Sequence, residues 1–294
     1  MSTFKKALFS VLALIMCVSL SGCVSLYYAP YDYAFENASK YSVGSGTVSA
    51  DSIKEIRIGW VSGDVNITSV PGNSIAFRES SRSAIRERYK MCYLLENGIL
   101  TIHFTRPVNV RGLAATRYSP PDKTLDVAVG EDLLSDLDLL SVDSVSGSVD
   151  ISGMSSLDLS VRLVSADVTV SDSHFGGVSV DAVSARGDIS CFADTIYVNC
   201  VSGDFTLRLS SCPRSMYLTS ISSNFKIYIP DNDGFISQFN SLAGRARYSF
   251  ACAWAGNKAI YKGGGASRFT FNSISGNVTI GPLSSPDPPP AIID

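Results

Sequence analysis

The sequence predicts an all-β protein whose main part is a single parallel β-solenoid with about 19–21 residues in each coil. Three observations support this prediction. A five-residue phrase recurs along the chain, its copies are almost evenly spaced, and apolar and polar residues alternate on both sides of each copy. Such alternation is typical of short strands that bury one face.

The recurring phrase consists of an apolar residue, a serine, a small residue, a polar residue and a second apolar residue. Complete copies occupy residues 61–65, 145–149, 164–168, 201–205, 221–225 and 274–278. Two weaker copies lie at Val183-Ser184 and at Leu242-Ala243-Gly244. Seven anchor positions follow if each copy after the first is counted from its serine or, in the second weaker copy, from Ala243. The anchors are Ser146, Ser165, Ser184, Ser202, Ser222, Ala243 and Ser275, which are spaced by 19, 19, 18, 20, 21 and 32 residues. Even spacing of this kind predicts coils that stack on one another in chain order.

Residues four and six positions before each anchor, and three and five after it, are mostly apolar and form the expected inward face. A single coil cannot fold alone. Five inward residues stabilise it by roughly 8–15 kcal/mol, whereas ordering about 19 residues costs on the order of 20–40 kcal/mol. Neighbouring coils about 4.8 Å away must therefore supply hydrogen bonds and close the core. A β-sandwich of hairpins is the alternative, and it explains the alternation but not the even spacing.

The two ends of the repeat are less regular. Ile56, Ile58, Val61, Val65 and Ile67 match the inward frame of a first coil. A polar, proline-containing loop is expected at residues 106–123, before a further apolar segment. The long final spacing leaves room for a loop or hairpin at residues 254–265 beside the last coil.

The first 22 residues are predicted to be a lipoprotein signal peptide, with Lys5 and Lys6 before an apolar run that is too short to span a bilayer. The run ends in Leu20-Ser21-Gly22-Cys23, which resembles the lipobox of bacterial lipoproteins. The resemblance implies that Cys23 is acylated and becomes the first mature residue. An ordinary secretory signal with an incidental cysteine is the alternative.

Four segments follow from this: the signal peptide (1–22), a lipidated tether (23–45), the β-solenoid (46–281) and a disordered, proline-rich tail (282–294). We expect a protein that is lipid-anchored to the bacterial cell envelope. Val24 stands where an aspartate would favour the inner membrane, so the outer membrane is the expected location. The sequence does not show which side of that membrane the domain faces.

Composition argues against several classes of partner. The formal net charge is −3 and no basic stripe is present, so no nucleic-acid partner is expected. The solenoid contains five cysteines, Cys92, Cys191, Cys200, Cys212 and Cys252, and they lack the spacing of a zinc site. We therefore expect no metal and no cofactor. Cys191 falls in the inward phase and is expected to be a core thiol.

The repeats also resemble a family of bacterial β-solenoid proteins known as putative adhesins, a domain of unknown function. The residues that carry the resemblance are Ser62-Gly63-Asp64-Val65, Ser202-Gly203-Asp204-Phe205, the glycines 263–265 and Ser275-Gly276-Asn277-Val278. The resemblance covers residues 50–281 and implies a β-solenoid fold. It supplies no catalytic residue.

Two groups of outward residues are candidates for function. Asp143, Arg162 and Asp181 are predicted to stack on adjacent coils, and the arginine would neutralise the two acids that a glycan-cleaving enzyme would need free. We therefore expect that the protein is not an enzyme. Tyr197 and Tyr217 are predicted to stack outward beside Asn199 and Thr219, as a candidate surface for a glycan or protein ligand. Cross-strand packing that only stabilises the sheet is the alternative for the tyrosines.

The sequence thus favours a membrane-anchored lipoprotein with a non-catalytic β-solenoid that serves in adhesion or in binding of an envelope polymer or protein. Its expected partners are the membrane, through the lipid anchor, and a glycan or protein on the side of the solenoid. A periplasm-facing structural or assembly factor of the envelope is the second hypothesis. A polysaccharide-active β-helix enzyme is the third.

Overall fold

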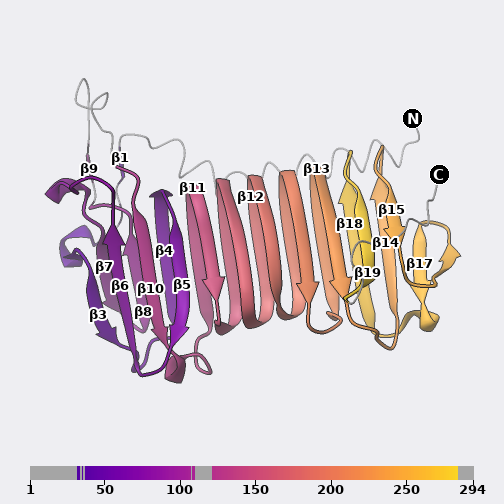
Figure 1. Ribbon diagram of the computed structural model, residues 1–294, viewed down its shortest axis with the longest axis horizontal. Helices are drawn as coiled ribbons and strands as arrows, with labels where there is room; N and C mark the ends of the chain where they lie inside the picture. The colour runs from indigo at the N-terminus through magenta and orange to yellow at the C-terminus, as the bar shows by residue number, and fades with distance from the viewer. Residues whose placement is uncertain (1–31, 34, 36, 107, 110–120, 284–294) are drawn as a thin grey trace.

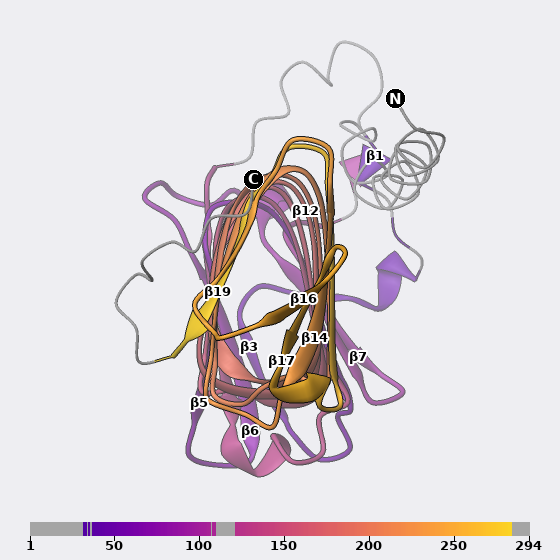
Figure 2. The same cartoon turned by 90° about the vertical axis from the view of Figure 1, so that its right-hand side faces the viewer.

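The computed structural model describes residues 32–33, 35, 37–106, 108–109 and 121–283, and most of these residues form one long β-solenoid (Figure 1). Strands β1 and β9 form a separate two-stranded sheet. Viewed along the long axis, the coils superpose in a flattened outline (Figure 2). Helical turns in the described residues are short 3-10 segments, and none of them is long and apolar enough to cross a bilayer. The predicted fold class is confirmed.

The central coils are regular and stack in register. They comprise β11 (Leu139–Ser152), β12 (Ser155–Leu209) and β13 (Ser215–Ile229). Strand β12 runs through Ser165, Ser184 and Ser202 without a break. Equivalent residues pair as parallel neighbours, for example Val142 with Val161 and Phe205 with Phe225. The repeat therefore predicts both the strands and their register.

The C-terminal coils do not follow chain order. The coil of Ser275, made of β18 (Ser267–Ser273) and β19 (Val278–Pro282), lies directly against β13. The coil of Ala243, made of β14 (Phe235–Ser241) and β15 (Ala246–Tyr248), is outermost (Figure 1). The prediction of chain-order stacking is wrong here. The chain first forms the outer coil, turns back through a hairpin of β16 (Ala253–Ala255) and β17 (Lys258–Tyr261), and then fills the space inside.

The N-terminal end has the same arrangement in reverse. The first coil, β4 (Glu55–Ser62) and β5 (Val65–Val70), is paired on one side with β11. On its other side lie β8 (Ile99–His103) and β10 (Thr124–Gly130), which are parallel to it and form an outer layer. The remaining elements around this end are β1 (Asp32–Tyr33), η1 (Ala38–Lys40), β2 (Ser42–Val43), β3 (Gly46–Ser49), β6 (Ser74–Ser80), η2 (Glu87–Tyr89), β7 (Cys92–Glu96), β9 (Val108–Asn109) and η4 (Glu131–Leu133).

Part of the segment expected to be a tether contacts the domain. Strand β2 pairs with Tyr93 and Cys92 of β7, and the ring of Phe35 stacks on His103 with centroids 4.1 Å apart. The signal peptide (1–22), Cys23 and most of the tail (282–294) lie outside the described residues.

Inward side chains form continuous apolar columns along the solenoid, as the alternation predicts. Cys191 is 5% exposed and belongs to this core. One inward residue of the first coil differs from the prediction. Trp60 is buried there, while Val61 is only half-buried, because the corner of the coil turns the residue before the serine away from the core.

Each corner of the repeated phrase brings neighbouring backbones very close. Gly147 has a φ of 118°, and a Cβ atom there would lie 2.1 Å from the carbonyl oxygen of Gly63 on the adjacent coil. The polar residue that follows bridges coils. The Asp64 carboxylate accepts from the Ser148 backbone N–H at 3.1 Å. Steric contact therefore explains the small residue of the phrase, and a backbone hydrogen bond explains its polar residue.

We expect Gly147→Ala to destabilise the fold more than Gly72→Ala. Gly72 is a matched control, since its φ of 125° is similar and nothing lies within 4 Å of its added Cβ. Left-handed strain alone costs about 1–2 kcal/mol, and overlap with the Gly63 carbonyl adds about 1–3 kcal/mol. Urea unfolding of the two variants measures the difference, and equal losses would show that corner contact does not limit this position.

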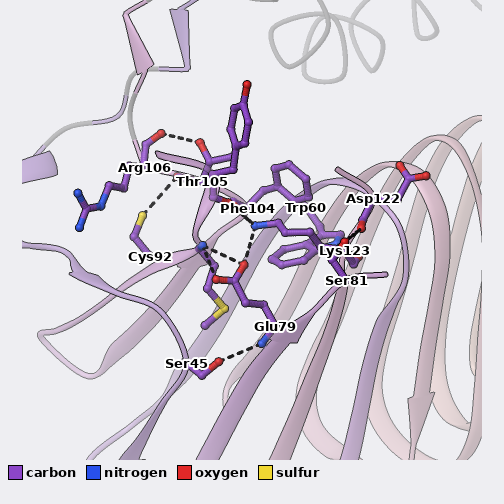
Figure 3. Close-up of polar contacts among 12 residues, drawn as sticks. Ser45, Trp60, Glu79, Ser81, Cys92, Phe104, Thr105, Arg106, Asp122 and Lys123 are labelled. Carbon is purple, nitrogen blue, oxygen red and sulfur yellow. Dashed lines mark hydrogen bonds and ion pairs between the residues drawn. The ribbon is translucent and has the colours of Figure 1, made fainter. Parts of the chain in front are cut away.

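A buried ion pair closes the N-terminal end of the solenoid (Figure 3). The Lys123 ammonium donates to the Glu79 carboxylate at 2.7 Å, to the Tyr89 carbonyl at 2.7 Å and to the Phe104 carbonyl. It also lies 4.1 Å from the centre of the Phe104 ring. The indole N–H of Trp60 donates to the Lys123 carbonyl at 3.0 Å. Lys123 was expected at the end of a polar loop and is instead 1% exposed.

Burial lowers the pKa of Lys123, and the hydrogen bond that its ammonium donates to Glu79 acts in the opposite direction. The Glu79 carboxylate also accepts the backbone N–H of Met91 at 3.0 Å from each oxygen. The pair therefore ties β6 to the segments around Tyr89 and Phe104. Without a partner, either charge would remain buried and unpaired.

Lys123→Met should therefore destabilise the protein by about 3–5 kcal/mol, since the Glu79 carboxylate loses its counter-charge while it stays buried. Arg208→Met is the control, because it breaks the exposed ion pair with Asp188 and should cost no more than about 1 kcal/mol. Thermal and urea unfolding provide the comparison. Similar losses in both variants would contradict a structural role for the buried pair.

Candidate ligand-binding surface on the side of the solenoid

Tyr197 and Tyr217 lie side by side on the outer face, on adjacent coils of β12 and β13. Their ring centroids are 5.2 Å apart and the ring planes differ by 6°. The side chains are exposed by 48% and 43%, because the residues on either side of each tyrosine point into the core. The structure thus brings together the two tyrosines that the sequence places in one column.

Asn199 and Thr219 form the neighbouring pair two residues further along the same strands. The Asn199 amide donates to the Asp181 carboxylate at 3.2 Å, while its carbonyl oxygen is buried and has no partner among the described residues. Burial raises the pKa of Asp181, and this hydrogen bond partly opposes the shift. Asn199 therefore supports the face by joining two coils. We call Tyr197, Tyr217, Asn199 and Thr219 the tyrosine surface.

The coil order changes one neighbour of the tyrosine surface. Chain-order stacking places Gln238 next to Tyr217, whereas the structure places Thr270 of β18 there and Gln238 beyond it. The ring of Tyr217 therefore has a small side chain, not a long amide, as its next neighbour in the column.

A hollow of about 520 Å³ lies on the other side of the tyrosine surface, next to Tyr197. Sequence reasoning missed it. Its lining includes Leu157, Gly176, Gly177, Ser179, Asp194 and Tyr197. The available signal was the glycine pair inside a strand, where glycine weakens the sheet and often marks a place that something approaches closely. We call this feature the glycine hollow.

The charged column is partly as predicted. Arg162 binds Asp143 through two parallel contacts of 2.5 and 2.6 Å, and Asp181 is held by Asn199. A second hollow of about 460 Å³ lies over this pair and is bordered by His103. Burial lowers the pKa of His103 to about 4, so the imidazole is neutral at pH 7. The Arg162 guanidinium, and not the His103 imidazole, therefore neutralises the Asp143 carboxylate, as a salt-bridge ladder requires.

The five cysteines of the solenoid are free thiols, and burial raises the pKa of the Cys191 thiol to about 12. In the part of the chain that the structure describes, no group of three or more His, Cys, Asp or Glu side chains could hold a metal ion.

Comparisons with known proteins agree with the predicted family. The family model of the Toastrack DUF4097 domain matches residues 30–281. Among solved structures, the chain is similar to a putative cell adhesion protein from Clostridium sporogenes, at 11% identity and a TM-score of 0.40, over 82% of this chain and 99% of that one. It is also similar to a putative adhesin from Bacteroides fragilis, at 9% identity and a TM-score of 0.40, over 81% of this chain and 97% of that one. No curated protein matches the chain.

The family match spans every regular coil and both irregular ends of the solenoid. It confirms the resemblance drawn from the repeated Ser-Gly-Asp corners. The chain therefore belongs to the Toastrack DUF4097 family.

Proposed function

We propose that this protein is a lipid-anchored, non-catalytic binding protein of the bacterial cell envelope, and that it adheres to its ligand through the tyrosine surface. The observation that carries the proposal is the exposed, parallel pair of Tyr197 and Tyr217 rings. Aromatic rings that remain exposed in a folded protein provide a large contact area with a polar group at the edge. Glycans and peptides are both bound in this way.

The solenoid holds this surface rigid before any ligand arrives. Both strands are paired in register through the residues around the tyrosines, and Asn199 is fixed by its hydrogen bond to Asp181. A surface that needs no ordering on binding loses less conformational entropy. This favours a binding role over a role that depends on movement.

The charges on the same side favour binding over catalysis. Hydrolysis of a glycosidic bond by the usual route needs two carboxyl groups free to act as acid and base. Asp143 is engaged by Arg162, and Asp181 accepts a hydrogen bond from Asn199. The arrangement supports a protein that holds its ligand unchanged.

The anchor at Cys23 and the outer-membrane location are part of the proposal. Several acyl chains would attach the domain stably, since each buried methylene contributes about 0.8 kcal/mol. Protease treatment of intact cells distinguishes adhesion from the alternative of a periplasm-facing assembly factor. Cleavage of the domain supports adhesion, whereas protection until the outer membrane is opened supports the assembly factor.

Replacing both tyrosines, Tyr197→Ser with Tyr217→Ser, should reduce binding by about tenfold or more, because the aromatic contact area is lost. The measurement uses the purified domain on immobilised glycans and peptides and on whole cells. Stability should change little, since both side chains are outward. Trp254→Ser is the matched control, because Trp254 is also 48% exposed but lies in the hairpin at the far end. Unchanged binding by the double variant would disprove the role of the tyrosine surface.

A further inference from the structure

We propose that the glycine hollow is a subsite for one neutral hexopyranose ring of a glycan, with the apolar face of the sugar lying on the free face of Tyr197. This inference rests on the proposed binding function and adds the chemical class of the ligand. Three features carry it: the shape of the hollow, the geometry of the Tyr197 ring and the charge of the rim.

The hollow exists because one coil lacks side chains where its neighbours have them. Gly176 and Gly177 occupy the strand positions that hold Leu157 and Asp158 on the preceding coil. Leu157 is 61% exposed and forms one wall. The volume of about 520 Å³ is within the range of about 300–1,000 Å³ that is typical of small-molecule sites.

The Tyr197 ring forms the opposite wall and has one face free. Tyr217 covers its other face at 5.2 Å. The next residue in the column toward the hollow is Ser179, as the contact between Asn199 and Asp181 on the same two coils shows. Coils are about 4.8 Å apart, and aromatic rings stack at centroid distances of about 4.5–7 Å. A ring placed above Ser179 would therefore continue the stack of the two tyrosines.

The rim provides hydrogen-bonding groups for hydroxyls. The carboxylate of Asp158 lies over Gly177, since a Cβ atom at Gly177 would be 2.4 Å from its Oδ1. Asp194 and Arg214 form an exposed ion pair at 2.8 Å. Carboxylates accept hydrogen bonds from adjacent sugar hydroxyls, whereas an aromatic side chain of a peptide could stack on Tyr197 but would leave these acceptors unused.

The net charge on the rim of the glycine hollow disfavours acidic sugars. Its charged side chains are Asp158, Asp194 and Arg214, which together carry one negative charge. An anionic sugar such as a uronate or a sialic acid would be repelled, because like charges in a partly enclosed site destabilise binding. The geometry therefore points to a neutral pyranose.

Ser179→Tyr tests the proposal directly, because it places a protein ring where the sugar ring would lie. The substitution puts an aromatic residue on an outward, half-buried strand position, where such residues are favourable, so the fold should be retained. Thr270→Tyr is the matched control, since it extends the same column from the other side of Tyr217 without entering the hollow. Circular dichroism and thermal unfolding check that both variants fold.

The probe is an array of neutral hexopyranosides, sialylated and uronate-containing glycans and aromatic peptides, followed by calorimetry with the neutral glycan that binds best. We expect wild type to prefer neutral hexopyranosides. Ser179→Tyr should weaken that binding by about tenfold or more, and Thr270→Tyr should change it by less than about twofold.

Binding by Ser179→Tyr at wild-type affinity would overturn the subsite. If the double tyrosine variant still lost binding, the proposed function would stand and only the subsite would be wrong. If the double variant also retained binding, both would fail. A wild-type preference for acidic glycans or for aromatic peptides, or no binding to any neutral glycan, would overturn the assignment of a neutral sugar.

Discussion

The structure depends on how closely the corners of adjacent coils approach one another. At Gly147 and Gly203, a Cβ atom would lie 2.1 and 1.8 Å from a carbonyl oxygen of the coil below. This contact leaves room only for very small residues and fixes each coil in phase with the next. Since successive side chains in a strand point to opposite faces, one fixed phase determines every column. The Tyr197 and Tyr217 rings lie together for that reason.

The same stacking leaves two ends of the solenoid, and both ends have the same kind of strand arrangement. At each end a coil is added outside its predecessor in sequence, and antiparallel strands then cover it: β6 and β7 at one end, β17 at the other. An uncovered parallel edge would present unpaired backbone groups to other chains. The buried pair of Lys123 and Glu79 fastens the N-terminal end.

Features of the fold that repeat from coil to coil can be predicted from the sequence, whereas features that occur once cannot. The columns through Val142 and Val161, the inward Cys191 and the adjacent tyrosines all follow from periodicity. The position of β18 between β13 and β14 does not, because equivalent coils carry equivalent residues in any order. The burial of Lys123 depends on Glu79, which is 44 residues away, and a polar residue in a polar segment gives no sign of such a partner. The hollow was not predicted because its only signal, the glycine pair Gly176 and Gly177, carries no functional group.

The glycine pair and the tyrosine pair are more informative together than apart. Two stacked tyrosines on a sheet can be explained by cross-strand packing alone. Two adjacent glycines inside a strand weaken it, and neither adopts the left-handed conformation that favours glycine. A Cβ atom at Gly176 would lie 2.8 Å from the Leu157 carbonyl oxygen, so the close approach of the preceding coil restricts this position to glycine. The side chains that these glycines omit leave the hollow beside Tyr197 in which the proposed sugar ring would lie.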